Sequence, residues 1–330
     1  MPAPTLLTII LNYKTAQMTL DATKAARLAM DGMPGELLIV DNDSQDGSFE
    51  TMQAYVKAQG WADTRVVQSG HNGGYGAGNN VGIRTGLSDG TEPDYVYILN
   101  SDAFPEPGAI RALYDYLQTH PETGFAGSYI QGEDGERHIS TFRFPTLFSE
   151  FENAIKFGPV SRLLKKYRVP IFEIPATGPV DWLAGASLMM RQEVLDDIGL
   201  FDETFFLYFE ETDLCRRARK AGHEIIFVRE SVVTHLGSVS TGMKTWNRVP
   251  EYWFNSRLHY FRKNHGFVYT IAATSLHLLG GGLHWLRCKI TGKERGVSPY
   301  FLRTLARHDL ANIFRLKPGG AGSQTPRIGE

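Results

Sequence analysis

The stretch that decides the fold runs from residue 6 to residue 41 and begins LLTIILN, an apolar run that ends at Asn12. A helical pattern follows over residues 15–30, and a second apolar run, ELLIV at residues 36–40, leads to Asp41. A buried strand, a helix and a second buried strand form a βαβ unit, which predicts a parallel sheet covered by helices. Ligands of such sheets bind at the carboxyl ends of the strands, so the polar residues that close each strand are candidates for function.

The same alternation continues beyond this unit. The pattern predicts further helices and strands, with helices over residues 47–59, 77–88 and 106–118 and strands over residues 64–68 and 94–100. Together these units predict an α/β fold with a Rossmann-like, mostly parallel sheet and helices on both of its faces.

The second half of the chain is less regular. Residues 140–180 are rich in aromatic residues and proline and show weak periodicity, which predicts a long excursion from the sheet. Residues 180–191, VDWLAGASLMMR, predict a strand with a turn of small residues, and residues 211–222 predict a helix that ends at a glycine. A last predicted strand, EIIFV at residues 224–228, leads to His235.

The composition indicates a globular protein with a large core. The 330 residues are 42% hydrophobic and 12% aromatic, which excludes disorder, collagen and coiled coil as the main architecture. The net charge of −2 conceals two opposite parts, because residues 1–243 hold 20 basic and 32 acidic side chains, whereas residues 244–330 hold 14 and 4. An acidic body with a cationic tail predicts contact with an anionic partner, either a membrane surface or nucleic acid.

The cysteines and the amino terminus indicate the compartment. Cys215 and Cys288 belong to no C-x-x-C pair, so the sequence offers neither a disulfide framework nor a zinc knuckle. The first 14 residues lack a basic n-region, which argues against a signal peptide. We therefore expect a cytoplasmic protein in a reducing environment.

Residues 71–83, HNGGYGAGNNVGI, hold five glycines. This composition suits a loop whose backbone approaches a ligand closely, although a plain surface turn would also explain it. The spacing does not match G-x-G-x-x-G, and the chain contains no G-x-x-x-x-G-K-[ST]. A dinucleotide site and a P-loop are therefore disfavoured.

Two groups of carboxylates are candidates for chemistry. Asp102 follows a predicted strand and is either a ligand for a divalent cation that bridges a diphosphate or a simple turn and helix-cap residue. Glu210, Glu211 and Asp213 lie in the aromatic segment FLYFEETDL. A carboxylate enclosed by aromatic side chains can act as a general base near neutral pH, whereas the helix dipole alone would explain one or two of the three. His235 is a candidate metal ligand or phosphate contact, or a structural histidine.

In this order the motifs resemble the inverting glycosyltransferases of family 2, which have the GT-A fold, and among them a rhamnosyltransferase-like branch. The resemblance is carried by TIILNYK at residue 8, VDNDSQDGS at residue 40, HNGGYGAGNNVGI at residue 71, ILNSD at residue 98, WLAGASLMMR at residue 182 and FLYFEETDLCRRARKAGHEIIFV at residue 206. These motifs fall within residues 5–240, and their combination is specific while each alone is weak.

The resemblance implies a nucleotide-sugar site. Asn12 and Asp41 would hold the nucleotide base and ribose. The other expected contacts are residues that close the pocket or line its sugar end, namely Asn72, Gly73, Asn79, Asn100, Ser101, Asp102, Trp182 and Gly185.

The resemblance also implies catalytic and metal-binding residues. Asp102 matches the metal-binding carboxylate of the family's D-x-D motif, in which Asn100 replaces the first aspartate and leaves one charge fewer. Glu211 aligns with the catalytic base, beside Glu210 and Asp213, and His235 resembles the family's metal-binding histidine. The implied cofactor is Mg²⁺ or Mn²⁺.

The implied reaction is the transfer of a sugar from a nucleotide donor to a lipid-linked or polysaccharide acceptor in cell-envelope glycan synthesis. The branch implies L-rhamnose from dTDP-rhamnose, and a UDP-hexose or a galactofuranose donor is the alternative. A sugar nucleotidyltransferase is disfavoured because LNYKTAQMTL, after the first strand, lacks the glycine-rich, arginine-containing loop of such enzymes. A nucleic-acid-binding protein is disfavoured because the basic residues of the tail are dispersed and match no recognised motif.

The tail is expected to contact the inner face of the cell membrane. Residues 267–286 lack charged side chains apart from histidine and are flanked by basic residues. Twenty apolar residues would just span a bilayer, but the three glycines at 280–282 weaken a helix. We expect a segment that lies in the membrane interface, and a helix buried in the protein or a spanning helix are the alternatives.

The expected domains follow from these patterns. Residues 1–243 form the GT-A domain, residues 244–318 a basic, amphipathic helical extension, and residues 319–330 a disordered tail. The sequence leaves open whether the protein forms a homo-oligomer.

Overall fold

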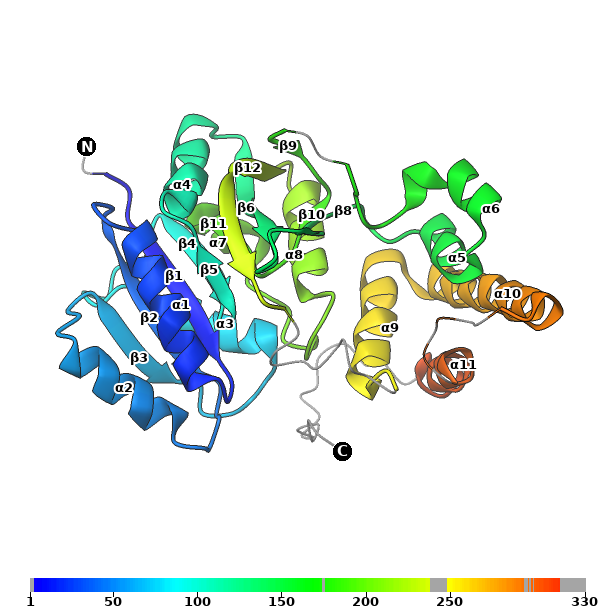
Figure 1. Ribbon diagram of the computed structural model, residues 1–330, viewed down its shortest axis with the longest axis horizontal. Helices are drawn as coiled ribbons and strands as arrows, with labels where there is room; N and C mark the ends of the chain where they lie inside the picture. Colours follow the sequence, from blue (N-terminus) through cyan, green and yellow to red (C-terminus); the bar gives the residue numbers. More distant parts are fainter. Residues whose placement is uncertain are drawn as a thin grey trace.

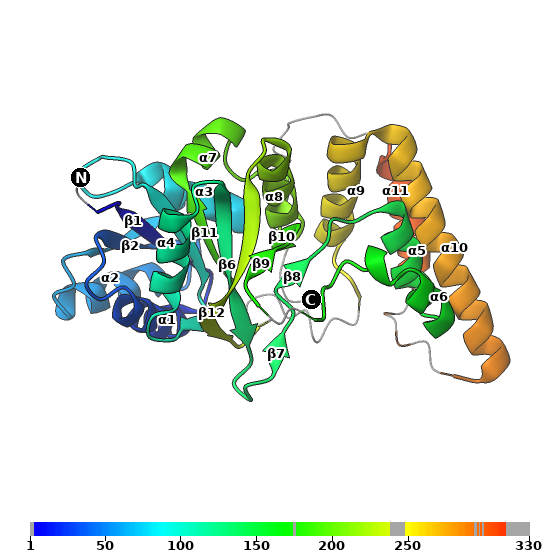
Figure 2. The ribbon, with the colours of Figure 1, turned by 90° about the horizontal axis from the view of Figure 1, so that it is seen from above.

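The computed structural model describes residues 3–173, 176–237, 248–293, 296, 298 and 300–314. They form a sheet with flanking helices and, beside it, a group of helices from residues 147–163 and 251–312 (Figures 1 and 2). Residues 319–330, predicted as a disordered tail, and the predicted domain boundary at residues 243–244 lie outside the described residues.

The strands are mostly short, and nearly all belong to one mixed sheet. They are β1 (Leu6–Asn12), β2 (Gly35–Asp41), β3 (Thr64–Gln68), β4 (Tyr95–Asn100), β5 (Ala103–Pro105), β6 (Thr123–Gln131), β7 (Arg137–His138), β8 (Thr141–Phe142), β9 (Gly178–Pro179), β10 (Trp182–Leu183), β11 (Ser187–Arg191) and β12 (Glu224–His235). In the described residues the main sheet has the order β3-β2-β1-β4-β11-β6-β12-β5, and β8 pairs with β10 separately.

The helices cover the sheet or form the group beside it. They are α1 (Ala16–Ala29), α2 (Ser48–Ala58), α3 (Tyr75–Thr85), α4 (Ala109–Thr119), α5 (Leu147–Ile155), α6 (Gly158–Leu163), α7 (Gln192–Ile198), α8 (Glu210–Lys220), α9 (Glu251–His265), α10 (Phe267–Thr291) and α11 (Phe301–Asn312). The predicted α/β fold class is confirmed, because apolar clusters fill the space on both faces of the sheet.

The parallel strands bring the predicted polar residues to one edge of the sheet. In the register of β1 with its two neighbours, Asn12 lies beside Asp41 and Leu11 lies beside Asn100. The carboxyl ends of β1, β2 and β4 therefore meet, as the alternating pattern indicated.

Two features of the sheet were not predicted. Strand β6 lies between β11 and β12, but its sequence, TGFAGSYIQ, is rich in small residues and poor in the branched side chains that mark strands. Strand β11 was predicted as a strand, and the structure shows that it runs antiparallel to both β4 and β6. Strands β5 and β9 also run antiparallel to β12, and β7 runs antiparallel to β6, so the sheet is mixed.

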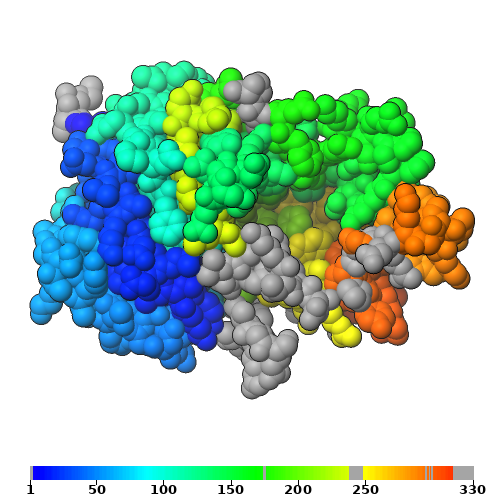
Figure 3. Space-filling model, viewed as in Figure 1, coloured from blue at the N-terminus to red at the C-terminus, as the bar shows by residue number. Residues whose placement is uncertain are grey.

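The predicted excursion at residues 140–180 contains α5, which packs against α10, and α6, which packs against α5 (Figure 3). Helix α5 begins with a capping box in which Thr146 and Ser149 exchange hydrogen bonds. A serine in place of the usual Glu or Gln at the third position hides this signal in the sequence.

A buried ionic cluster joins the helical group. The side chain of Arg257, on α9, is 1% exposed and lies 2.6 Å from Glu150 of α5 and 3.2 Å from Asp309 of α11. Burial raises the pKa of Glu150, but the Arg257 charge and a hydrogen bond from His277 outweigh burial and lower that pKa to about 2. These three charges fix the relative placement of α5, α9 and α11.

Helix α10 buries one face and exposes the other. His277 and His284 lie on the buried face, and Gly280 allows the helix to approach α5, since a Cβ there would lie 2.8 Å from the backbone oxygen of Phe151. Within the described ranges, no helix combines the length and the apolar character that crossing a membrane requires.

Candidate active site

The first part of the site lies where β1 and β2 end. Asn12 is fully buried, and its Nδ2 donates to Oδ1 of Asp41 at 2.6 Å and to Oγ of Ser44 at 3.1 Å. Asp41 also accepts from the Ser44 hydroxyl at 2.6 Å and from the Ser44 backbone amide at 3.1 Å. The two predicted residues thus bind each other, and Ser44, which the sequence analysis missed, completes the set. The signal that could have identified Ser44 is its position three residues after an aspartate, a spacing typical of such a turn.

The glycine-rich segment forms the neighbouring wall. Asn42 was not predicted, yet its Nδ2 donates to Oδ1 of Asn72 at 3.0 Å and to the backbone oxygen of Gly74 at 3.2 Å. The buried Oδ1 of Asn42 has no hydrogen-bond partner among the described residues. It is therefore available to a donor group on a ligand.

The two other predicted residues of this wall make local contacts. Nδ2 of Asn79 donates to the backbone oxygen of Tyr75, one turn earlier in α3. A Cβ at Gly73 would lie 2.7 Å from Cβ of Ala77, so the tight turn before α3 has room only for glycine.

The end of β4 meets the end of β12 at the predicted metal ligands. Nε2 of His235 lies 3.0 Å from Oδ1 of Asp102 and 3.3 Å from Nδ2 of Asn100. The side chain of Asp102 is 7% exposed and that of His235 is 18% exposed. Ser101 lies beside them, with its Oγ 3.3 Å from the hydroxyl of Thr15.

This donor set fits a divalent cation that shares its ligands with a substrate. A carboxylate and an imidazole converge at one point, and rotation of the Asn100 amide would add a carbonyl oxygen. No cluster of three or more His, Cys, Asp or Glu side chains with metal-binding geometry occurs in the described part of the chain. A cation bound here would have Asp102 and His235 as its protein ligands, and diphosphate oxygens would be needed to complete the shell.

Glu210 and Glu211 open helix α8 but have different environments. Glu210 is 2% exposed, and burial together with the neighbouring Glu211 raises its pKa well above the ordinary value. Burial raises the pKa of Glu211 to about 7, although backbone hydrogen bonds from its own residue and from Gly185 act in the opposite direction. One oxygen of each carboxyl group is buried without a hydrogen-bond partner among the described residues. Burial thus favours the protonated form of Glu210, and a pKa of about 7 allows Glu211 both to take up and to release a proton near neutral pH.

Tyr75 connects the carboxylates to the metal-ligand pair. Its hydroxyl donates to the backbone oxygen of Gly185 at 2.6 Å. Its pKa is raised well above the ordinary value, first by burial, then by the charges of Glu211 and Glu210, and to a smaller extent by Asp102. Tyr75 lies within the glycine-rich motif, but its role could not be predicted from the sequence, because its contact with Gly185 arises only in the tertiary structure.

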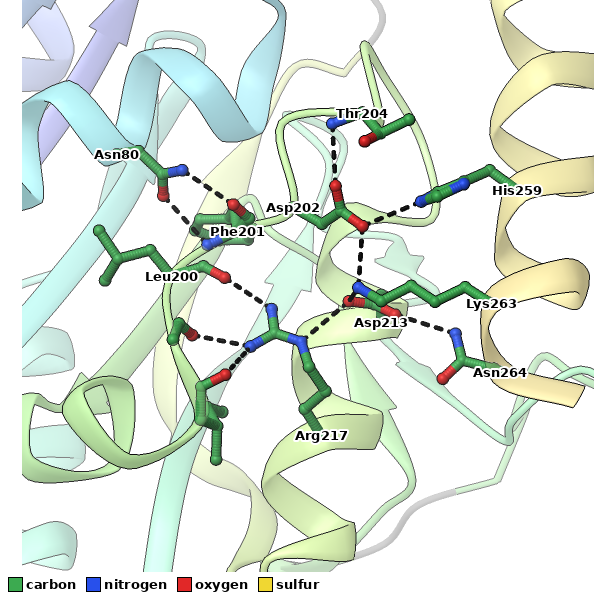
Figure 4. Close-up of polar contacts among 12 residues, drawn as sticks. Asn80, Leu200, Phe201, Asp202, Thr204, Asp213, Arg217, His259, Lys263 and Asn264 are labelled. Carbon is green, nitrogen blue, oxygen red and sulfur yellow. Dashed lines mark hydrogen bonds and ion pairs between the residues drawn. The ribbon is translucent and has the colours of Figure 1, made fainter. Parts of the chain in front are cut away.

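Trp182 and Asp213, both predicted site residues, make contacts within the protein. The indole of Trp182 stacks on Phe142 with ring centroids 4.0 Å apart, and its Nε1 donates to the backbone oxygen of Arg143 at 2.9 Å. Asp213 is fully buried and its carboxylate is directed toward α9, where it contacts Lys263 (Figure 4). Its helical position, two residues after Glu211, turns it away from that carboxylate.

The chain is similar to proteins of known activity. Residues 8–178 match the family model described as glycosyl transferase family 2. An N-acetylglucosaminyl-diphospho-decaprenol L-rhamnosyltransferase of Mycobacterium tuberculosis is 35% identical over 219 residues, which make up 63% of this chain and 69% of that protein. The rhamnosyltransferase WbbL of Escherichia coli K12 is 26% identical over 159 residues, 47% of this chain and 58% of that protein.

A similar solved structure agrees with the fold. It is a mannosyltransferase from Pyrobaculum calidifontis in complex with GDP-Man and Mn²⁺, with a TM-score of 0.53 and 14% identity. The similarity covers 95% of this chain and 76% of that one.

Proposed function

Because the chain belongs to glycosyltransferase family 2, we propose that it transfers one sugar from a nucleotide donor to a lipid-linked or polysaccharide acceptor, with inversion at the anomeric carbon. One observation carries this proposal: Glu211, with a pKa of about 7, lies in the same site as the Asp102 and His235 pair. A base and a metal-ligand pair around one site are the two functions that displacement of a nucleoside diphosphate requires.

In the proposed mechanism Glu211 removes the proton of the acceptor hydroxyl as its oxygen attacks the anomeric carbon. The bond to the nucleoside diphosphate breaks on the opposite face, so one in-line displacement inverts the centre. The transition state is oxocarbenium-like, by analogy with glycoside hydrolysis. The raised pKa of Glu210 favours its protonated form, which disfavours a second negative charge beside the base.

Asp102 and His235 would hold Mg²⁺ or Mn²⁺, which would offset the charge that develops on the leaving diphosphate. The P. calidifontis structure was solved with Mn²⁺, which supports a divalent cation in the proposed reaction. Asn100 in place of an acidic residue leaves the site with one carboxylate, and His235 would supply the second ligand.

The proposed donor is dTDP-L-rhamnose. The names of the M. tuberculosis and E. coli relatives support rhamnose, and the first of them supports a diphospho-polyprenol acceptor. The alternatives are a UDP-hexose and a galactofuranose donor.

The proposed nucleotide-sugar contacts act either directly or by shaping the pocket. They are Asn12, Asp41, Asn72, Gly73, Asn79, Ser101, Trp182 and Gly185. Asn42 joins them because of its unpartnered oxygen.

The enzyme is proposed to work at the inner face of the cell membrane, through residues 244–318. The outward face of α10 supports this location, because its exposed side chains are mainly apolar, namely Val268, Ile271, Leu279, Leu283, Leu286 and Ile290. The nearby cations Arg287 and Lys289 match anionic headgroups. An apolar helix face with basic neighbours is the pattern of an interfacial helix.

The test is an assay of purified protein against dTDP-, UDP- and GDP-sugars with Mg²⁺ or Mn²⁺, scored for sugar transfer and donor hydrolysis. Glu211→Gln should lower kcat by about 10²–10⁴-fold and leave nucleotide binding intact. Wild-type protein that neither transfers nor hydrolyses any donor would refute the proposed function. Equal loss of binding and turnover in Glu211→Gln would instead show that Glu211 is structural.

A further inference from the structure

The segment that carries the base enters helix α8 through a strained turn. Tyr208 and Phe209, directly before Glu210, have φ angles of 69° and 71°. Side chains other than glycine rarely adopt this left-handed conformation, and two in succession persist only where the surroundings hold them. Since Glu211 follows at once, the conformation of this turn decides where its carboxylate lies.

From the sheet side, α3 holds the loop that leads into the turn. Asn80 accepts from the backbone amide of Phe201 at 3.0 Å and donates to the backbone oxygen of the same residue at 2.9 Å. The backbone amide of Tyr75 donates to the oxygen of Phe206 at 2.9 Å. These bonds fix the loop at its two ends, residues 201 and 206, and leave residues 207–209 to be held from elsewhere.

From the other side, one face of α9 holds the loop. The hydroxyl of Ser256 donates to the backbone oxygen of Leu207 at 3.0 Å, and Nε2 of His259 lies 2.9 Å from Oδ2 of Asp202. Lys263 follows one turn later and donates to the same Asp202 oxygen at 2.8 Å (Figure 4). The spacing of 256, 259 and 263 places the three side chains on one face of the helix.

Lys263 also reaches α8 itself. Its Nζ donates to Oδ2 of Asp213 at 2.7 Å, while Asn264 donates to the other oxygen at 2.9 Å and Arg217 adds a bond of 3.0 Å (Figure 4). Asp213 is fully buried, so these contacts satisfy a charge that would otherwise be costly. Lys263 is therefore the cation that ties loop residue Asp202 to helix residue Asp213.

Hydrogen bonds from α9 stabilise the charged form of Asp202. Burial raises the pKa of Asp202, but hydrogen bonds from His259 and Lys263 outweigh it and hold this pKa well below its ordinary value. The ring of Phe205, which is fully buried, packs edge-on against His259 with centroids 4.7 Å apart. The loop is thus held by both polar and apolar contacts with α9.

We propose that Lys263, with Ser256 and His259, forms an α9 clamp that holds the Tyr208–Phe209 turn and thereby positions Glu211 for catalysis. Lys263 is a positioning residue, because its contacts are Asp202 and Asp213 and not the reacting groups. The helix that bears the clamp also carries Arg257, which is paired with α5 and α11. The helical extension therefore contributes to the active site as well as to the proposed membrane surface. The catalytic part of this inference rests on the proposed function.

The first test measures the loop without any substrate. Hydrogen–deuterium exchange is compared in Lys263→Met, in Lys263→Arg and in Lys220→Met, a matched control on the exposed side of α8. In Lys263→Met, amides of residues 201–213 should exchange about tenfold faster or more, with strand β4 unchanged. The control should match the wild type, and Lys263→Arg should stay close to it. Exchange rates in this loop that are equal in Lys263→Met and Lys220→Met would overturn the clamp.

The second test measures positioning by turnover. Lys263→Met should lower kcat about tenfold or more while the donor KM stays within about twofold, and Lys263→Arg should recover most of the loss. Ser256→Ala, a milder change, should show the same split on a smaller scale and serves if Lys263→Met fails to fold. Unchanged kcat in a folded clamp variant would overturn the positioning role. Wild-type protein without transferase activity would refute the proposed function, and the exchange measurement would still decide the clamp.

Discussion

Replacing Glu211 with glutamine should stabilise the protein at alkaline pH. Burial raises the pKa of Glu211 from 4.5 to about 7. Between these values the folded protein keeps a proton that the unfolded chain has lost, so the free energy of unfolding falls as the pH rises. Glutamine has the same shape and no proton to lose, so the variant lacks this pH dependence.

The magnitude follows from the size of the shift. One pKa unit corresponds to about 1.4 kcal/mol, and integration between pH 5 and pH 8 gives a loss of about 2.5 kcal/mol from this group. Relative to the wild type, Glu211→Gln should therefore gain about 2.5 kcal/mol in unfolding free energy when the pH is raised from 5 to 8. The assay is urea unfolding, followed by tryptophan fluorescence at several pH values.

A control with the opposite sign is available. Burial raises the pKa of Glu203, but hydrogen bonds from Asn80 and Arg84 outweigh it and lower that pKa. Below about pH 5, Glu203→Gln should therefore lose stability relative to the wild type as the pH rises, whereas between pH 5 and pH 8 the two stability profiles should run parallel. Parallel stability profiles for Glu211→Gln and the wild type would refute the raised pKa, and with it the argument that Glu211 is a base suited to neutral pH.

Three other predictions concern packing, buried charge and the exposed face. Gly74→Ala should lower both thermal stability and kcat, because a Cβ would lie 1.9 Å from the backbone oxygen of Phe206, whereas Gly90→Ala, with similar φ and open space, should have a smaller effect. Arg257→Ala should lower the unfolding free energy by about 3–5 kcal/mol in urea titrations, since it removes the arginine charge that two buried carboxylates share. The double substitution Leu283→Glu and Ile290→Glu should abolish cosedimentation with anionic vesicles at unchanged thermal stability. The control Leu28→Glu, at an exposed position of α1, should leave cosedimentation unchanged.

The parallel half of the sheet could be predicted from local pattern. The run LLTIILN is apolar apart from Thr8 and its last residue, and the run LLIVD is apolar until its last residue, so both the strands and their functional ends are visible in the sequence. Strand β6 could not be predicted from local pattern, because its small residues are buried by the neighbouring elements that cover them and carry few bulky apolar side chains of their own. Helices α5 and α6 were not predicted because they are stabilised by tertiary packing, α5 against α10 and α6 against α5.

The candidate site shows the same division between what local pattern indicates and what tertiary contacts decide. Asp102, Glu211 and His235 were identified as residue types within motifs, and the structure brings Asp102 and His235 to 3.0 Å. The roles of Tyr75 and Asn80 depend on partners far along the chain, Gly185 and Phe201, and no local pattern indicates such contacts.

By itself the sequence determined the family, the fold class and the identity of the groups available for chemistry, because strand periodicity and short motifs are local properties. Only the tertiary structure separated the two adjacent glutamates, since the pKa of each depends on how deeply neighbouring elements bury it. Only the tertiary structure, likewise, turned Asp213 toward Lys263, fifty residues later. Desolvation and long-range ion pairs are set by which elements pack together, and that packing is a property of the whole chain.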